Sequence, residues 1–162
     1  RDTSGNRFYY YSTDPQATPQ LIGQFGKTYK LLINVNGISY TSETTIPLLT
    51  KTMDSIWWKP APNNDDRTKV VLMARVKDPP GLGNYIRYFT RQNSQAFLPG
   101  LNSVFDDNII DGKTYEIQVD RGVNRNEDID FETYGFFQKG DTVSVKLCNI
   151  NKSTFDFWRT WE

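Results

Sequence analysis

Carboxylates are the main side chains through which this sequence could perform acid–base chemistry. The sequence contains no histidine and a single cysteine, Cys148. Without histidine there are no imidazole general bases, no histidine-containing triads and no histidine-ligated metal sites. One cysteine cannot form a disulfide within the chain. A chain without imidazole has few ways to be a catalyst, and pairs of carboxylates are the candidates that this sequence offers.

One group of acids, Asp106, Asp107 and Asp111, lies within a short stretch of the sequence. Glycoside hydrolysis needs two carboxyl groups and no histidine, so this group is a candidate for a polysaccharide hydrolase. The same residues sit in Asp107-Asn108 and Asp111-Gly112, and Asx side chains in such dipeptides satisfy backbone donors in turns. The sequence leaves both interpretations open and favours the turns.

A second acidic stretch, residues 120–132, alternates Asn and Asp in the manner of oxygen-rich calcium loops. Its weak candidate metal ligands are Asn126, Asp128 and Asp130. An EF-hand calcium loop also needs a glycine at its sixth position and a bidentate carboxylate at its twelfth, and the spacing here meets neither requirement. A solvated loop is the favoured interpretation, and no cofactor is predicted.

Aromatic residues make up 14% of the chain and concentrate on predicted strands. The candidate ligand-binding residues, which could form a platform for a sugar ring, are Trp57, Trp58, Tyr85, Tyr88 and Arg87. Because adjacent residues of a strand point to opposite faces, at least one of the two tryptophans is expected in the core. A binding platform and plain core packing both remain open, and packing is favoured.

The elements that must position these side chains are mostly β-strands. Alternating apolar residues on both sides of Asn36-Gly37 predict a hairpin over residues 27–46, since this dipeptide adopts the positive φ angles of a type I′ turn. Further strands, bounded by Gly, Pro, Asn and Asp, are predicted at residues 54–60, 69–77, 85–91, 113–119 and 142–150. Residues 97–111 are predicted to be irregular, because Pro99-Gly100 marks a bend.

Only the C-terminal end of the sequence predicts a helix. Ser153 is the expected N-cap, with Asp156 three residues later as in a capping box. The apolar stripe of this helix consists of Phe155, Phe157, Trp158 and Trp161. Sheets with one apolar face must bury it against another layer. The sequence therefore predicts a mainly β fold, an immunoglobulin-like antiparallel β-sandwich with one short C-terminal helix.

Charge and hydropathy limit the classes of partner. The chain has 19 basic and 19 acidic residues, and this balance argues against a nucleic-acid binder that follows phosphates. No apolar stretch approaches the roughly 18 residues that would predict a membrane-spanning helix. The first residues also lack the pattern of a signal peptide.

A series of short motifs carries a family resemblance. In chain order they are residues 26–31 (GKTYKL), 44–47 (TTIP), 54–56 (DSI), 78–81 (DPPG) with 83–85 (GNY), 105–107 (FDD) with 111–115 (DGKTY), 140–143 (GDTV) and 155–159 (FDFWR). Together they extend over nearly the whole chain and resemble a family of outer-membrane-associated Bacteroidetes lipoproteins catalogued as domain of unknown function 4249.

The resemblance implies a protein of the cell envelope, either lipid-anchored at the outer membrane or periplasmic, and often encoded beside TonB-dependent receptors. It implies an N-terminal lipidated cysteine, an immunoglobulin-like β-domain ahead of this region, and no known catalytic residues. The sequence lacks the lipidated cysteine and the family's polar C-terminal tail, so a fragment is expected. Residues 1–50 would be the remnant of the N-terminal immunoglobulin-like β-domain, and residues 51–162 a second β-rich domain ending in a helix.

The leading hypothesis is a non-catalytic accessory binding protein of TonB-dependent uptake. The expected partners are a TonB-dependent receptor or a glycan, nucleic acid is not expected, and membrane contact would occur only through a lipid anchor absent from this chain. A carboxylate-dependent polysaccharide hydrolase and a purely structural spacer are the alternatives. Two carboxyl groups facing one cleft would favour the hydrolase.

Overall fold

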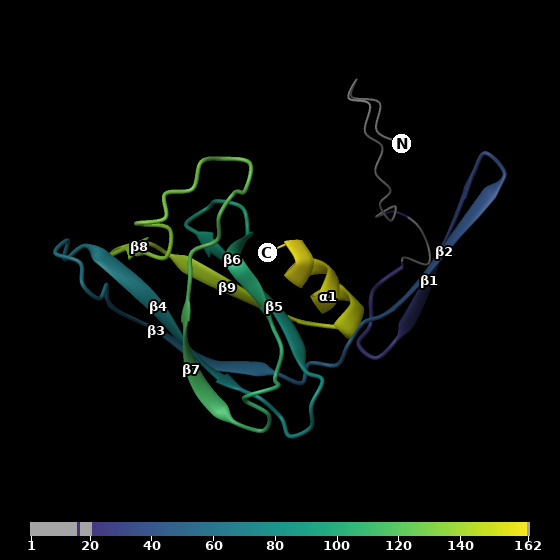
Figure 1. Ribbon diagram of the computed structural model, residues 1–162, viewed down its shortest axis with the longest axis horizontal. Helices are drawn as coiled ribbons and strands as arrows, with labels where there is room; N and C mark the ends of the chain where they lie inside the picture. The colour runs from purple at the N-terminus through teal and green to yellow at the C-terminus, as the bar shows by residue number, and fades with distance from the viewer. Residues whose placement is uncertain (1–15, 17–20, 162) are drawn as a thin grey trace.

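The computed structural model describes residue 16 and residues 21–161 and consists mainly of β-strands (Figure 1). All strand pairs in this part of the chain are antiparallel. The elements are β1 (Thr28–Val35), β2 (Ile38–Thr45), β3 (Thr52–Pro60), β4 (Lys69–Lys77), β5 (Tyr85–Gln92), β6 (Leu98–Phe105), β7 (Thr114–Val119), β8 (Phe137–Gln138), β9 (Val143–Ile150) and α1 (Lys152–Trp161). The predicted mainly β fold with one short C-terminal helix is confirmed.

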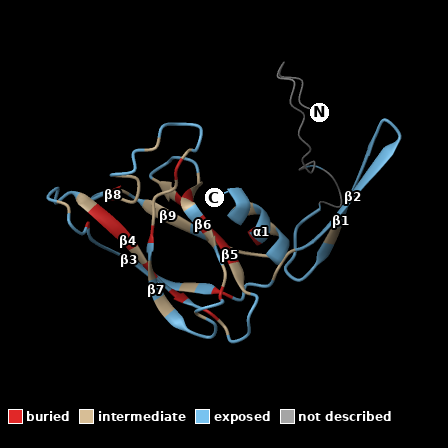
Figure 2. Cartoon of the chain, in the orientation of Figure 1, coloured by how far each residue is buried: buried red, intermediate tan, exposed pale blue. Residues whose placement is uncertain are grey.

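Two sheets enclose the hydrophobic core. One has the order β3-β4-β7, with β8 also pairing with β4, and the other has the order β6-β5-β9. Alternate residues of β4 point into the core, and Ala74 and Val76 are completely buried there. Figure 2 shows the buried segments concentrated on the central strands, including β4 and β5. The arrangement is consistent with the predicted immunoglobulin-like β-sandwich.

Strand β6 shows that the irregular structure predicted for residues 97–111 is wrong over most of that range. The strand pairs with β5 and forms an edge of its sheet. Pro99 is tolerated in an edge strand, where some backbone groups need no ladder partner. Gly100 is required by packing, because a Cβ atom there would lie 2.5 Å from the Tyr88 hydroxyl. The Pro-Gly pair therefore belongs to an edge strand that contacts the core.

Helix α1 begins earlier than its predicted cap. The Asn151 Oδ1 atom accepts a hydrogen bond from the Thr154 backbone N–H at 2.8 Å, so Asn151 is the N-cap and the Ser153 prediction is wrong. The buried Phe155 packs against Tyr85 of β5, with the ring centroids 4.9 Å apart. In the described part of the chain, no helix has the length and apolar character needed to cross a membrane.

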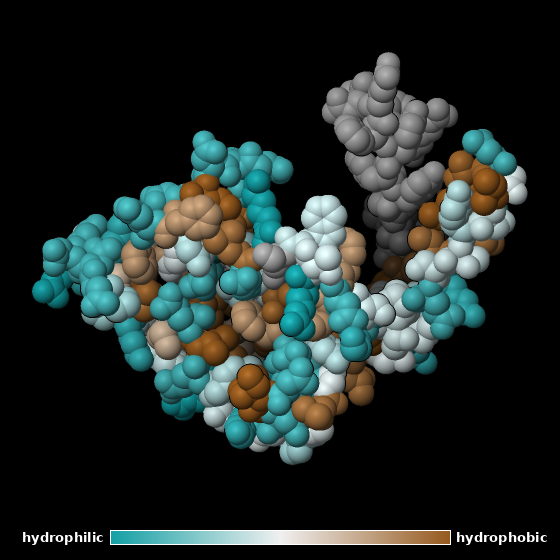
Figure 3. Space-filling view, viewed as in Figure 1, coloured by the Kyte–Doolittle hydropathy of each residue, from teal (hydrophilic) through white to brown (hydrophobic). Residues whose placement is uncertain are grey.

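The β1–β2 hairpin stands away from the sandwich, and among the described residues its strands pair only with each other (Figure 1). Asn36 and Gly37 have φ angles of 52° and 79°, which confirms the predicted turn. The exposed apolar residues of the hairpin are Leu31, Leu32, Ile33, Val35, Ile38 and Tyr40. Figure 3 shows apolar surface on this arm. The predicted domain division at residue 50 stays a prediction.

A buried ion pair lies where the linker from the hairpin enters the sandwich. The Lys51 and Asp78 side chains are both completely buried, and the Lys51 Nζ atom lies 2.8 Å from the Asp78 Oδ1 atom. The Lys51 backbone N–H donates to the Asn149 side chain of β9, and the Asn149 amide donates back to the Lys51 carbonyl. These contacts join the linker to both sheets.

Candidate functional site: an aromatic cleft at the open edge of the sandwich

One side of the sandwich is open, because β3 and β9 are edge strands of their sheets. In the β3–β4 register, Ile56 lies opposite Ala74 and Trp58 opposite Leu72. Directly opposed residues of paired strands share a face, so Ile56 and Trp58 share the face of the core residues Ala74 and Leu72. Their exposed fractions are nevertheless 46% and 55%. The second sheet therefore leaves this end of the inner face uncovered.

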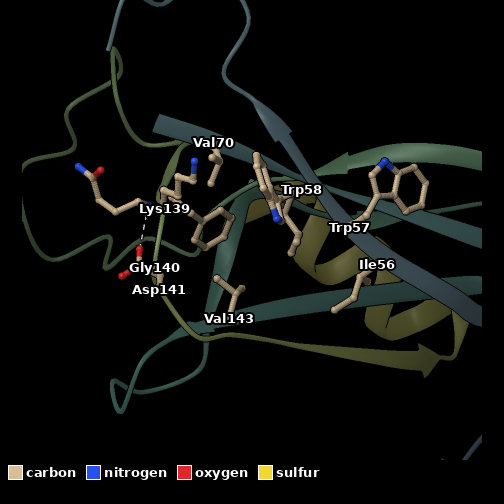
Figure 4. Close-up of a pocket in the computed structure, with 11 residues that line it drawn as sticks. Ile56, Trp57, Trp58, Val70, Lys139, Gly140, Asp141 and Val143 are labelled. Atoms are coloured by element: carbon tan, nitrogen blue, oxygen red, sulfur yellow. Dashed lines mark hydrogen bonds between the residues drawn. The ribbon is translucent and has the colours of Figure 1, made fainter. Parts of the chain in front are cut away.

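A cavity of about 400 Å³ occupies this open edge (Figure 4). The buried residues Val70, Leu72 and Phe137 contribute to its lining from β4 and β8, and Val143 contributes from β9. The volume lies within the range of about 300–1,000 Å³ that is typical of small-molecule sites. The cleft is therefore a preformed apolar site of a suitable size for a small ligand.

The Trp58 ring and the Lys139 ammonium form the aromatic and charged parts of the cleft. The Lys139 Nζ atom lies 5.6 Å from the centroid of the Trp58 ring, which is within cation–π range. Both side chains border the cavity, and Figure 4 shows them on the side where Val70 and Val143 also lie. An exposed indole offers a flat apolar surface that the C–H face of a sugar ring can cover, and the ammonium can donate to a hydroxyl.

The turn at the rim of the cleft is fixed by Asp141. Its carboxylate accepts hydrogen bonds from the Gln138 backbone at 2.8 Å, the Gln92 side chain at 2.6 Å and the Asn93 side chain at 3.0 Å. Burial disfavours the charged form, but the hydrogen bonds from Asn93, Gln138 and Gln92 outweigh it and hold the pKa of Asp141 below its usual value. The carboxylate is ionised near neutral pH and holds the loop beside Lys139 in place.

The structure does not bring the five predicted ligand-binding residues together. Trp58 and the half-buried Trp57, which precedes it on the strand, both line the cavity, and the Lys59 ammonium lies 5.9 Å from the centroid of the Trp57 ring. Tyr88 is 4% exposed and belongs to the core. Tyr85 packs on helix α1. The prediction that at least one of the two tryptophans lies in the core is wrong, because Trp57 is half-buried, Trp58 is exposed, and both border the open cavity.

Arg87, the fifth predicted residue, is also buried. It is 8% exposed, its Nε atom donates to the Ser103 hydroxyl at 3.1 Å, and its guanidinium lies 3.6 Å from the centroid of the Trp158 ring. Trp158 belongs to helix α1, so this stack holds the helix against the sheet. Arg87 has a structural role in this arrangement and does not line the cleft.

The three acids of the hydrolase hypothesis act as loop clamps. Asp107 is 1% exposed and accepts hydrogen bonds from the Gly83 and Asn84 backbones, both at 3.0 Å. Asp111 accepts from the Gly81 backbone at 2.6 Å. Asp106 borders a separate cavity of about 480 Å³, whose described lining contains no second carboxylate. This geometry supports the turn interpretation over a catalytic pair.

The electrostatic surroundings of Asp107 agree with this structural role. Burial tends to raise its pKa, but hydrogen bonds from the Asn84 and Gly83 backbones and the Asn84 side chain outweigh burial and lower it. The neighbouring Tyr115 phenol is partly desolvated and lies near the charges of Asp78 and Asp107, which together raise its pKa to about 12. The Tyr115 phenol therefore stays neutral beside these acids near neutral pH.

The weak metal-ligand candidates lie in an exposed loop. Asp130 accepts from the Thr133 hydroxyl at 2.6 Å and from the Glu132 backbone at 3.0 Å, so it organises a local turn. Asp128 and Asp130 border a cavity of about 270 Å³, whereas Asn126 is absent from the described lining. As metal ligands, Asn126, Asp128 and Asp130 stay weak candidates.

A tighter acidic group, which the sequence did not reveal, consists of Asp78, Asp107 and Asp111, with carboxylate oxygens within 4.8 Å of one another. The Lys51 ammonium already lies beside Asp78, and the Gly112 backbone N–H donates to the Asp78 Oδ2 atom at 3.1 Å. One lysine and several backbone donors thus already occupy oxygens of these three carboxylates.

Fold and cleft together define the class of protein: an antiparallel β-sandwich with an apolar cleft at its open edge. The family model described as Domain of unknown function (DUF4249) matches residues 1–162, and the chain belongs to this family. No curated protein and no solved structure matched the chain. The resemblance indicated by the ordered motifs is therefore confirmed at the level of the family.

Proposed function

We propose that this chain is a non-catalytic binding module of a cell-envelope protein, and that it binds a neutral glycan in the cleft between β3 and β9. The observation that carries the proposal is the position of Trp58. A large indole that shares the face of core residues is 55% exposed above an apolar cavity of about 400 Å³. Exposed aromatic rings beside preformed pockets are typical of ligand sites.

The described contacts support binding over catalysis at this cleft. The one carboxylate in its lining, Asp141, accepts hydrogen bonds from three neighbours and fixes the rim. Lys139 adds a donor beside the ring. The chemistry of the cleft is therefore apolar contact with one polar anchor, which suits the alternating C–H and hydroxyl groups of a sugar.

The envelope location and the accessory role are part of the same proposal. They are supported by the ordered motifs, which resemble Bacteroidetes lipoproteins often encoded beside TonB-dependent receptors. In this proposal the module holds a glycan near the transporter that imports it, and the lipid anchor lies outside this chain. Co-purification with a receptor encoded beside the gene is the matching test of the partner.

The test of glycan binding compares two exposed tryptophans, Trp58 in the cleft and Trp161 on helix α1. A panel of neutral oligosaccharides is titrated by calorimetry into the native chain, Trp58→Ala and Trp161→Ala. We expect Trp58→Ala to weaken binding by about tenfold or more, because truncation of a buried aromatic anchor typically costs about 2 kcal/mol or more. Trp161→Ala removes an exposed indole from helix α1, which does not belong to the cavity lining, and should leave the affinity within about twofold.

Two results would contradict the proposal. Equal losses in the two tryptophan variants would show that the cleft is not the site. No binding of any neutral glycan by the native chain, with its fold verified by circular dichroism, would reject the ligand class.

A further inference from the structure

A second surface lies on the outer face of the β6-β5-β9 sheet, away from the cleft. Tyr88 and Thr90 of β5 are buried, so the alternate residues Phe89 and Arg91 point outward. Lys146 of β9 lies opposite Phe89 in the register and shares this face. We call the outward-facing set of Phe89, Arg91, Phe97 and Lys146 the cationic strip.

Cations and aromatic rings alternate along the cationic strip. The Lys146 Nζ atom lies 5.2 Å from the centroids of both Phe89 and Phe97, and the Arg91 guanidinium lies 4.7 Å from the centroid of Phe97. Each distance is within the range of about 6 Å for a cation–π contact. The rings hold the two cations in place, so little side-chain entropy remains to be lost when a ligand binds.

The positive charges of the strip have no carboxylate partner within the described residues. Strands β5, β6 and β9 contain no Asp or Glu, and neither Arg91 nor Lys146 forms an ion pair there. On the other sheet, Arg75 pairs with Glu116 at 2.8 Å. Arg91 donates only to the Ser144 hydroxyl, at 3.2 Å, and its Nε atom makes no hydrogen bond. The strip therefore carries uncompensated positive charge on a rigid surface.

The strip differs from the Arg87 stack on the same sheet. Trp158 covers the Arg87 guanidinium, and Arg87 is buried. Lys146 is exposed, and Arg91, Phe89 and Phe97 are partly exposed. Packing of helix α1 explains the contact between Arg87 and Trp158, but it does not explain the contacts within the cationic strip.

We propose that the cationic strip binds an anionic polysaccharide, one that carries carboxylate or sulfate groups on its sugar rings. Lys146 and Arg91 supply donors for the anionic groups, and the exposed parts of Phe89 and Phe97 contact the apolar faces of the sugars. The balanced charge of the chain, with 19 basic and 19 acidic residues, argues against a nucleic acid, whose affinity depends on many phosphate contacts. This site goes beyond the proposed cleft and uses none of its residues.

The test measures binding of polygalacturonate and dextran sulfate, with neutral dextran as the control, by affinity electrophoresis at low salt. We expect Lys146→Gln to weaken binding of the acidic polymers by about threefold, the effect of one partly exposed charge contact. The double variant Lys146→Gln/Arg91→Gln should weaken it by about tenfold, and Lys146→Arg should retain it. Added salt should weaken the native complex, because exposed charges are screened.

Matched controls separate this site from general charge effects and from the cleft. Lys77→Gln removes an exposed lysine from the other sheet and should have no effect. Trp58→Ala should also have no effect on the acidic polymers, so failure of the strip and failure of the cleft are distinguishable. The proposal is overturned if neither acidic polymer binds, or if Lys77→Gln weakens binding as much as Lys146→Gln. Tighter binding to single-stranded oligonucleotides or to anionic lipid vesicles would also overturn it.

Discussion

The hairpin and the sandwich are built from similar alternating strands but differ in burial. Ile86 in β5 is 1% exposed, whereas Ile33 in β1 is 38% exposed. Both regions have regular antiparallel pairing. The local pattern of residues therefore determines strands and turns, whereas stability comes from the layer that covers the apolar face.

The exposed face of the hairpin is larger than an isolated two-stranded unit usually tolerates. Two strands alone are marginally stable in water, and a contiguous apolar surface usually marks a contact. The proposal that residues 1–50 belong to a separate β-domain gives this face a role, since further strands of such a domain would cover it.

The largest expected effect comes from the buried ion pair that joins the two regions. Lys51→Met leaves the Asp78 carboxylate buried without its cation, so we expect the free energy of unfolding of the sandwich to fall by about 3–5 kcal/mol. Chemical denaturation followed by tryptophan fluorescence measures this change. Lys30→Met removes an exposed lysine whose Nζ atom lies 3.0 Å from Glu43 of the hairpin, and it should cost less than about 1 kcal/mol. Equal losses of unfolding free energy in the two variants would show that burial does not determine how much each ion pair stabilises the fold.

The next largest difference in the free energy of unfolding is expected between two isoleucine substitutions, one in the sandwich and one in the hairpin. Ile86→Ala should lower the free energy of unfolding by about 2–5 kcal/mol, because it opens a cavity in the core. Ile33→Ala, the same substitution in the hairpin, should change the stability of the sandwich by less than about 0.5 kcal/mol. Thermal and urea denaturation of both variants measure the difference. A large loss in Ile33→Ala would mean that the hairpin packs on the sandwich in solution.

The smallest expected effect concerns acid sensitivity. The folded pKa of Asp107 is lowered from its ordinary value of 3.8, so its stabilising contribution is fully present above that value and is lost as the pH falls through the folded pKa. The stability difference between the native chain and Asp107→Asn should therefore shrink as the pH falls from about 5 to about 2. Urea denaturation at several pH values measures it. A constant difference would show that ionisation of Asp107 does not stabilise the fold.

The sequence predicts most elements that depend on local chemistry. Strand β4 spans the predicted residues 69–77, and Asn36-Gly37 forms the predicted turn. Strand β6 was not predicted, because Pro99 and Gly100 are local signals of a bend. The structure explains both residues: β6 is an edge strand, which tolerates Pro99, and Gly100 leaves room for the Tyr88 side chain. Strand β8, with two residues, is too short to produce a periodic pattern.

The candidate site was only partly predictable. Alternation on β3 predicted at least one tryptophan in the core, but the register with β4 places Trp58 on the inner face where the second sheet does not cover it, and Trp57 is only half-buried. Phe137 of β8 and Val143 of β9 line the cleft together with residues of β4. These segments are distant in the sequence, so no local pattern predicts that they lie together. The Gly140-Asp141 turn was the one local signal near the rim. The Lys51–Asp78 pair joins distant segments, so neither residue type nor spacing revealed it.

The most direct test of the account is a two-dimensional NMR titration with the neutral glycan that binds best by calorimetry. We expect shifts at the Trp58 indole N–H and at the amides of Lys139 and Val143, with the hairpin and the cationic strip unchanged. Shifts confined to β1 and β2, or to Phe89 and Lys146, with an unmoved Trp58 indole, would contradict it.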